Sequence, residues 1–388
     1  MIQNSRAKAV WSCLFLWGGL ACLWGTVVLA QESRAELPPP EPSAQETSTE
    51  DRAWDFSGEW TGFLGQTFGD QDLSFWGGRY LPKWTVDTEL DGPVRFEAEL
   101  IPYLAYSAQT SPTGSTDQAK SSLHRAWVRF YDENLGTRLG LQEIRFGPGK
   151  VLRSLQWFDT LDYQDPTGFS EAVEGLLVRR YFENNSNLWV WGLVNTKDQR
   201  YGQAIFSTAK DRPQWGGRME MQAGRGEMAV SFNHSQVSLY NQQAVVPENR
   251  LGLEFHQDLG VGVWGEGAVS QRSNTGYQPA TDFLGTLGLD YTFAVLGGLY
   301  VLVEQQGQKI GTSGEGFTQS RGAYSGSLPL SVQEQVRATY LESDGGQSSW
   351  QLDYRFTSDA WVFGLVGTGS YLQGETRNGL VLLAQWNH

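Results

Sequence analysis

Apolar and polar residues alternate in short segments through most of the chain after residue 53. In the first segment the apolar residues share one parity and the polar residues share the other: Trp54, Phe56, Trp60 and Leu64 against Asp55, Ser57, Glu59 and Thr61. Successive side chains of a β-strand point to opposite faces, so this period predicts a strand with one apolar and one polar face.

The same period recurs to the end of the chain, and the segments are separated by Gly, Asn, Asp and Pro. Clear examples are Val94–Leu104, Ala126–Phe130, Leu251–Phe255, Phe283–Phe293 and Trp350–Phe356. No segment of this region has the period of an amphipathic helix. We therefore predict an all-β fold over residues 54–388: a transmembrane antiparallel β-barrel of about 16–18 strands with an inward-folded constriction loop.

A secreted soluble β-sandwich would also alternate, so other features must distinguish the two. Aromatic residues flank the apolar positions, as in the interfacial girdles of membrane barrels: Trp54, Tyr131, Tyr291, Trp350 and Trp386. A sheet of this length would leave costly open edges unless it closed into a ring. These features favour the membrane barrel.

The N-terminus predicts export. Residues 1–30 carry Arg6 and Lys8, a largely apolar run and a small-residue exit at Ala30, as expected of a cleaved signal peptide. The alternatives are an uncleaved membrane anchor or lipidation at Cys22. Residues 31–53 are rich in Pro, Glu, Ser and Thr and predict a flexible periplasmic leader. Together with the barrel pattern, the signal predicts the outer membrane of a Gram-negative bacterium.

Composition excludes several functions. Cys13 and Cys22 both lie in the predicted signal, so the mature chain would lack cysteine, and no paired histidines predict a metal site or cofactor. The net charge of -14 argues against a nucleic-acid partner. The four histidines have no nucleophile motif around them, so we expect no catalytic residue and no enzyme activity.

One stretch interrupts the alternation. A strand pattern over Leu135–Gln142 leads to a Gly-Pro-Gly turn at 147–149, residues 151–171 show no period, and a strand pattern resumes at Val173. A long loop between two strands is therefore predicted. We expect it to fold into the lumen and restrict passage.

The strand before this loop carries a specific motif. Arg138, Gly140 and Gln142 at alternate positions, followed by Phe146-Gly147, resemble a strand of bacterial outer-membrane porins of the alginate-export type. The stretch 171–181 resembles a segment that follows in that family. The resemblance implies a barrel fold and a transport role, with Gln142 beside Arg138 in the pore lining.

Basic residues cluster around the loop in a chain that is otherwise acidic. Three neighbouring strands would carry these residues: Arg125 and Arg129 on one, Arg138 on the next, and Arg180, or else Arg179, after the loop. If they face inward, they would form a positive ladder. Guanidinium groups grip carboxylates in a fixed fork, so the ladder would guide anionic solutes such as carboxylates or sugar acids. The alternative is that these residues pair with nearby glutamates and brace the wall.

The loop also has acidic residues at every third position: Asp159, Asp162 and Asp165. This spacing could hold Ca²⁺, but it lacks the Gly and the closing Glu of a calcium loop, so turn formation is the better account. Within a constriction these carboxylates would face the basic ladder and contribute to selectivity.

The sequence thus predicts an outer-membrane channel for passive diffusion or export of small polar solutes, including anionic ones such as carboxylates or sugar acids. Its partners would be outer-membrane lipid and these solutes, and association into a homo-oligomer is left open. The alternative is a surface adhesin or structural barrel without a transport role.

Overall fold

The computed structural model describes residues 53–69, 72–90, 92–165, 167–194, 206–239, 244–272, 281–311, 317–372 and 374–388. The predicted signal peptide, 1–30, and all of the predicted leader except Ala53 lie outside these residues. No helix within the described ranges is both long and apolar enough to cross a membrane.

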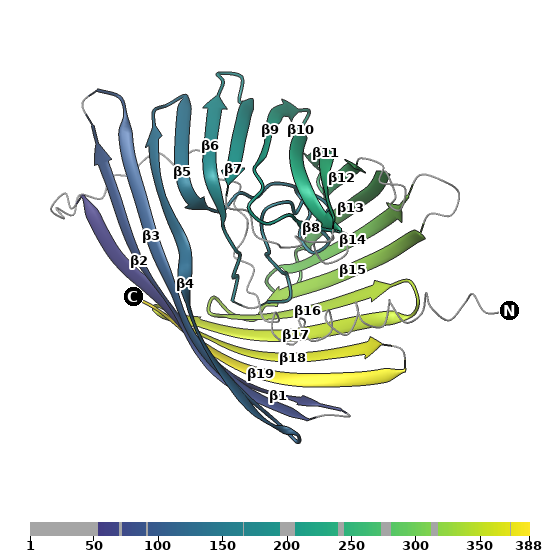
Figure 1. The fold of residues 1–388 in the computed structure, drawn as a ribbon. Coiled ribbons are helices and arrows are strands. Elements are labelled where there is room, and N and C mark those ends of the chain that lie inside the picture. Colours follow the sequence, from purple (N-terminus) through teal and green to yellow (C-terminus); the bar gives the residue numbers. More distant parts are fainter. Residues whose placement is uncertain are drawn as a thin grey trace. The chain divides into compact units, whose positions relative to one another are not determined.

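The described residues form strands joined by turns and loops (Figure 1). In chain order the strands are β1 (Trp54–Phe68), β2 (Leu73–Glu89), β3 (Arg95–Ser111), β4 (Gly114–Tyr131), β5 (Leu135–Gln142), β6 (Val173–Tyr181), β7 (Asn187–Val194), β8 (Ser207–Thr208), β9 (Gln214–Ala223), β10 (Gly226–Leu239), β11 (Ala244–Asp258), β12 (Gly262–Arg272), β13 (Thr281–Phe293), β14 (Leu299–Ile310), β15 (Phe317–Pro329), β16 (Glu334–Ser343), β17 (Gln347–Ser358), β18 (Trp361–Leu372) and β19 (Glu375–Asn387).

Eighteen of these strands close into an antiparallel ring. Each pairs with its neighbour in sequence, β7 pairs directly with β9, and β1 pairs with both β2 and β19. The two-residue strand β8 pairs only with β10 and is not one of the strands of the ring. The prediction of an all-β barrel with 16 or 18 strands is confirmed at 18.

The distribution of apolar and polar residues over the two faces of the ring is the reverse of that in a soluble protein. On β11, Leu251, Leu253 and Phe255 are exposed on the outside, whereas Arg250 and Glu254 on the inside are buried. Leu253 is 56% exposed and the adjacent Glu254 only 9%. The outer face is therefore apolar and the inner face polar, as the predicted alternation requires.

The chain divides into two compact units. The barrel unit contains all strands and the first part of the long β5–β6 loop, through Asp159. The second unit contains the loop segment Thr160–Ser170.

Candidate functional site

The β5–β6 loop leaves its strand through the Gly-Pro-Gly turn at 147–149. Gly147 has a φ of +97°, a conformation that glycine adopts at little cost. An added Cβ would lie 2.5 Å from a carboxylate oxygen of Glu266 at Gly147, and 2.8 Å at Gly149. The two glycines therefore let the loop backbone lie directly against the inner side of β12.

Aromatic packing fixes the first part of the loop against β7. Phe146 and Phe158 contact Trp191 of β7, with ring centroids 5.9 and 5.4 Å away, and Phe146 meets Trp157 edge to face at 5.4 Å. Trp191 is 1% exposed, and its indole N–H donates to Asn233 at 3.0 Å. This part of the interior is a packed apolar core inside an otherwise polar lumen.

The tip of the loop is bound by a carboxylate on β14. The backbone N–H of Lys150 donates to Glu304 Oε1 at 2.7 Å, and those of Val151 and Leu152 donate to Oε2 at 2.8 and 2.6 Å. The indole N–H of Trp264 adds a fourth hydrogen bond at 3.1 Å. Glu304 thereby satisfies three consecutive loop amides.

A second carboxylate, on β12, binds the residues on both sides of this tip. Glu266 accepts the backbone N–H of Gly149 at 3.0 Å and of Leu155 at 3.1 Å. It also accepts the backbone N–H of Ser154. Between these two strands, Thr286 of β13 lies 2.8 Å from the Ser154 hydroxyl. Three adjacent strands thus bind the loop.

The side chain of Lys150 extends this contact. Its ammonium group lies 2.6 Å from a carboxylate oxygen of Asp290 and 2.9 Å from the hydroxyl of Tyr300. It also lies over the ring of Trp264, 5.0 Å from the centroid. The ammonium group of Lys150 therefore interacts with side chains of the barrel wall.

Asp159, one of the predicted selectivity residues, is buried and paired with Arg153. The guanidinium donates to both carboxylate oxygens, at 2.5 and 3.0 Å, and the two side chains are 1% and 5% exposed. Burial lowers the pKa of Arg153, but the negative charges of Asp159, Glu266 and Glu143 together raise it by more, so the pKa lies above its ordinary value. The carboxylate of Asp159 serves the internal structure of the loop.

Asp162 and Asp165 lie in the segment Thr160–Ser170. Asp162 accepts the backbone N–H of Gln164 at 2.9 Å, and Asp165 accepts the backbone N–H of Thr167 at 3.1 Å and its hydroxyl at 2.7 Å. Both carboxylates make the local turns expected of aspartate.

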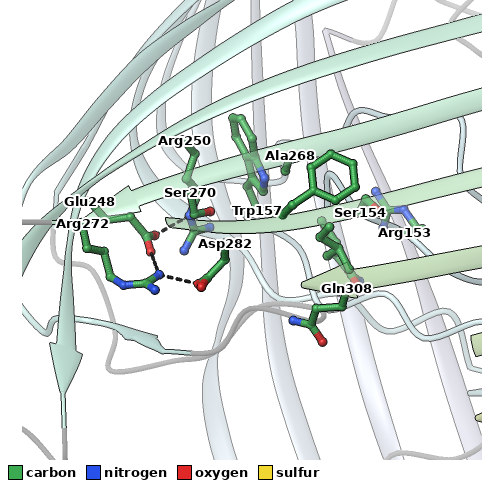
Figure 2. A pocket seen from close by; sticks show the side chains of 13 residues that line it. Arg153, Ser154, Trp157, Glu248, Arg250, Ala268, Ser270, Arg272, Asp282 and Gln308 are labelled. Carbon is green, nitrogen blue, oxygen red and sulfur yellow. Dashed lines mark hydrogen bonds and ion pairs between the residues drawn. The ribbon is translucent and has the colours of Figure 1, made fainter. Parts of the chain in front are cut away.

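A pocket of about 480 Å³, part of it open to solvent, lies between the loop and the inner wall (Figure 2). Arg250, Arg272 and Glu248 line it on the wall, and Trp157 lines it from the loop. Glu248 accepts from Arg250 Nε at 2.6 Å and from Arg272 at 3.0 Å, and Arg272 also pairs with Asp282 at 2.7 Å. The wall of the pocket is a chain of alternating charges.

The predicted basic residues Arg125, Arg129 and Arg138 lie on the inner face. Arg129 and Arg138 are register partners on β4 and β5. Arg125 pairs with Glu143 at 3.0 Å and Arg129 pairs with Glu97 at 3.4 Å. The structure thus places Arg129 beside Arg138 and Arg125 further along the same face, and it gives Arg125 and Arg129 glutamate partners.

The other two predicted pore-lining residues occupy different places. Gln142 is fully buried and donates to the Gly175 carbonyl at 3.0 Å, so it joins β5 to β6. Arg180 is exposed and has the parity of Leu176, which lies on the outer face. The inner position on β6 belongs to Arg179, whose guanidinium lies 3.9 Å from the ring centroid of Trp189.

Several inner charges were not singled out from the sequence. Arg218 of β9 donates to both oxygens of Glu254, at 2.5 and 2.7 Å. Arg250, Glu266 and Glu304 lie at inward positions of their strands. Their parity alone would have placed them inside, because charged residues in alternating barrel strands face away from the apolar side.

No family model matches the sequence, and no curated protein matches it. Solved structures do share the fold. OccK2 (OpdF) of Pseudomonas aeruginosa, solved in complex with glucuronate, is 10% identical with a TM-score of 0.61, over 86% of this chain and 96% of that chain. OccK5 (OpdH) of the same organism is 10% identical with a TM-score of 0.60, over 86% and 97%.

A third structure, OccK7 (OpdD) of Pseudomonas aeruginosa, is 11% identical with a TM-score of 0.58, over 86% of this chain and 98% of that chain. At these identities the likeness shows a common barrel fold that nearly spans the neighbours' whole length.

Proposed function

We propose that the protein is an outer-membrane channel through which small polar solutes diffuse, with a preference for solutes that bear a carboxylate, such as sugar acids. The observation that carries this proposal is the inverted ring, apolar outside and polar inside, with a loop bound across its interior. An apolar outer face fits lipid, and a polar inner face fits a water-filled lumen. The predicted signal peptide is consistent with this location.

The preference for carboxylates rests on the inner guanidinium groups. Arg250 uses its Nε–H for Glu248, and no hydrogen bond of its two Nη groups is recorded in the described structure, so the open end of the fork can receive an acceptor. The acceptors Glu248 and Asp282 are already bound by Arg272. The Nη groups of Arg250 can therefore still donate hydrogen bonds into the pocket, and a carboxylate is the acceptor that suits them.

The fold neighbour OccK2, which was solved with glucuronate, supports the choice of sugar acids as first candidates. The motif around Arg138 and Gln142 resembles alginate-export porins, whose cargo would also be a uronate. Both considerations favour uronates over neutral sugars.

Liposome swelling tests the proposal. Vesicles that contain the folded protein are diluted into isosmotic glucose or sodium glucuronate, and we expect faster swelling than in empty vesicles, with glucuronate faster than glucose. Swelling at the rate of empty vesicles in both solutes would overturn the channel and favour an adhesin or structural barrel. Equal rates would overturn the preference alone.

A further inference from the structure

We propose that Glu266 and Glu304 are positioning residues that hold the loop segment 149–155 across the lumen, and that they do so only as ionised carboxylates. This inference rests on the proposed function, since it names the residues that fix the width of the channel. Neither residue needs to contact solute, because both act through the loop backbone.

The groups that face the two carboxylates are hydrogen-bond donors. In the described structure Glu304 acts only as an acceptor. It accepts hydrogen bonds from the backbone N–H groups of residues 150–152 and from the Trp264 indole N–H. Glu266 likewise accepts from the backbone N–H groups of Gly149, Ser154 and Leu155. An amide in place of either carboxylate would turn an NH₂ group toward N–H groups, and a protonated acid would turn an O–H toward them.

These hydrogen bonds are concentrated in one short part of the loop. Six backbone N–H groups between 149 and 155 depend on two wall residues. Buried amides without an acceptor are costly, and this stretch contains no strand or helix that could supply one. Loss of either carboxylate therefore favours release of the segment toward water.

The wall residues that bind the loop lie side by side on three adjacent strands. Glu266 on β12 is the register partner of Thr286 on β13, and Thr286 is the partner of Gln306 on β14, two residues from Glu304. The Ser154 hydroxyl lies against Thr286, in line with the two carboxylates. The loop is thus fixed by a platform of three strands at a place far from β5 and β6, where it is anchored covalently.

Hydrogen exchange measured by mass spectrometry tests this directly in the folded full-length mature protein. In Glu304→Gln and Glu266→Gln we expect the amides of 149–155 to exchange faster by on the order of 10- to 100-fold, as the loss of hydrogen bonds to a charged acceptor implies. The matched control is Glu342→Gln, because Glu342 is exposed and accepts from Tyr324 instead of the loop. We expect its loop to exchange as in the wild type.

Wild-type exchange in both glutamine variants would overturn the proposal, as would equal acceleration in Glu342→Gln. If a glutamine variant does not fold, Glu304→Asp decides: it keeps the charge but withdraws it from the loop, and wild-type protection would overturn the proposal. Exchange does not depend on transport, so a protein that conducts nothing would refute the proposed function and leave this result to be judged separately. In a conducting protein, we also expect the glutamine variants to admit larger sugars in liposome swelling.

Discussion

The guanidinium of Arg153 and the carboxylate of Asp159 form a two-point ion pair, at 2.5 and 3.0 Å, within the loop that lies inside the barrel. Both side chains are almost entirely buried. Removal of either partner leaves a buried charge without its counterion, which typically costs about 3–5 kcal/mol.

We therefore expect Arg153→Met and Asp159→Leu each to lower the free energy of unfolding by about 3–5 kcal/mol, and the double variant to lose less than the sum. Urea unfolding followed by tryptophan fluorescence measures this. Additive losses in the double variant would show that the pair is not coupled.

Arg138 and Arg180 differ in the face they occupy, so their substitution should differ in effect. Arg138→Ala removes a cation from the lumen and should lower the anion-to-cation permeability ratio by about two- to fivefold, from a change of about 0.5–1 kcal/mol in solute energy. Arg180→Ala, on the outer face, should leave the ratio unchanged. Reversal potentials in a KCl gradient measure both, and equal shifts would contradict the assignment of faces.

Gly147 and Gly345 have similar positive φ values, +97° and +89°, but different surroundings. A Cβ at Gly345 meets nothing within 4 Å, whereas one at Gly147 meets Glu266. Gly345→Ala should therefore cost only the strain of the backbone, about 1–2 kcal/mol. Gly147→Ala should cost about 1–3 kcal/mol more because of overpacking. Similar unfolding free energies for the two variants would refute close contact between the turn and Glu266.

The stability of the turn between β4 and β5 should depend on pH through Asp132. Its carboxylate accepts the backbone N–H groups of Asn134 at 2.7 Å and Leu135 at 2.8 Å, and these bonds lower its pKa. A lowered carboxylate pKa stabilises the turn above the unfolded value of 3.8, and the effect is lost as pH falls through the folded value.

Exchange of these two amides, corrected for the intrinsic dependence on pH, should therefore accelerate only below pH 3.8. Asp132→Asn should show no such step. A step of the same size in the asparagine variant would assign it to another group.

The barrel could be predicted from the sequence because a period of two is local information. Leu253 and Glu254 lie on opposite faces in the structure, as their alternation requires. On β6 this signal fails, since Leu176 and Leu177 are both apolar yet only Leu177 faces inward. The aromatic residues of the loop cover the inner wall there, so an apolar residue no longer marks the outer face, and Arg180 could not be separated from Arg179.

The loop was predictable as an interruption, but its anchoring was not. Glu304 binds the amide of Leu152 across a separation of 152 residues, and no local pattern connects them. Asp159 was not predictable for a different reason: its partner Arg153 lies only six residues away in the same loop, but the spacing of the aspartates did not indicate that the two side chains would be buried together. The contact between Glu304 and Leu152 follows from closure of the ring, which sets which inner residues face each other.

Single-channel recording in planar lipid bilayers measures whether the barrel conducts ions. Purified mature protein, shown to be folded by heat-modifiable migration on a gel, is added to a bilayer in KCl. We predict discrete stepwise increases in current, each from one inserted channel, that are partly reduced when glucuronate is present. A folded protein that inserts without any current step would contradict the proposed channel function.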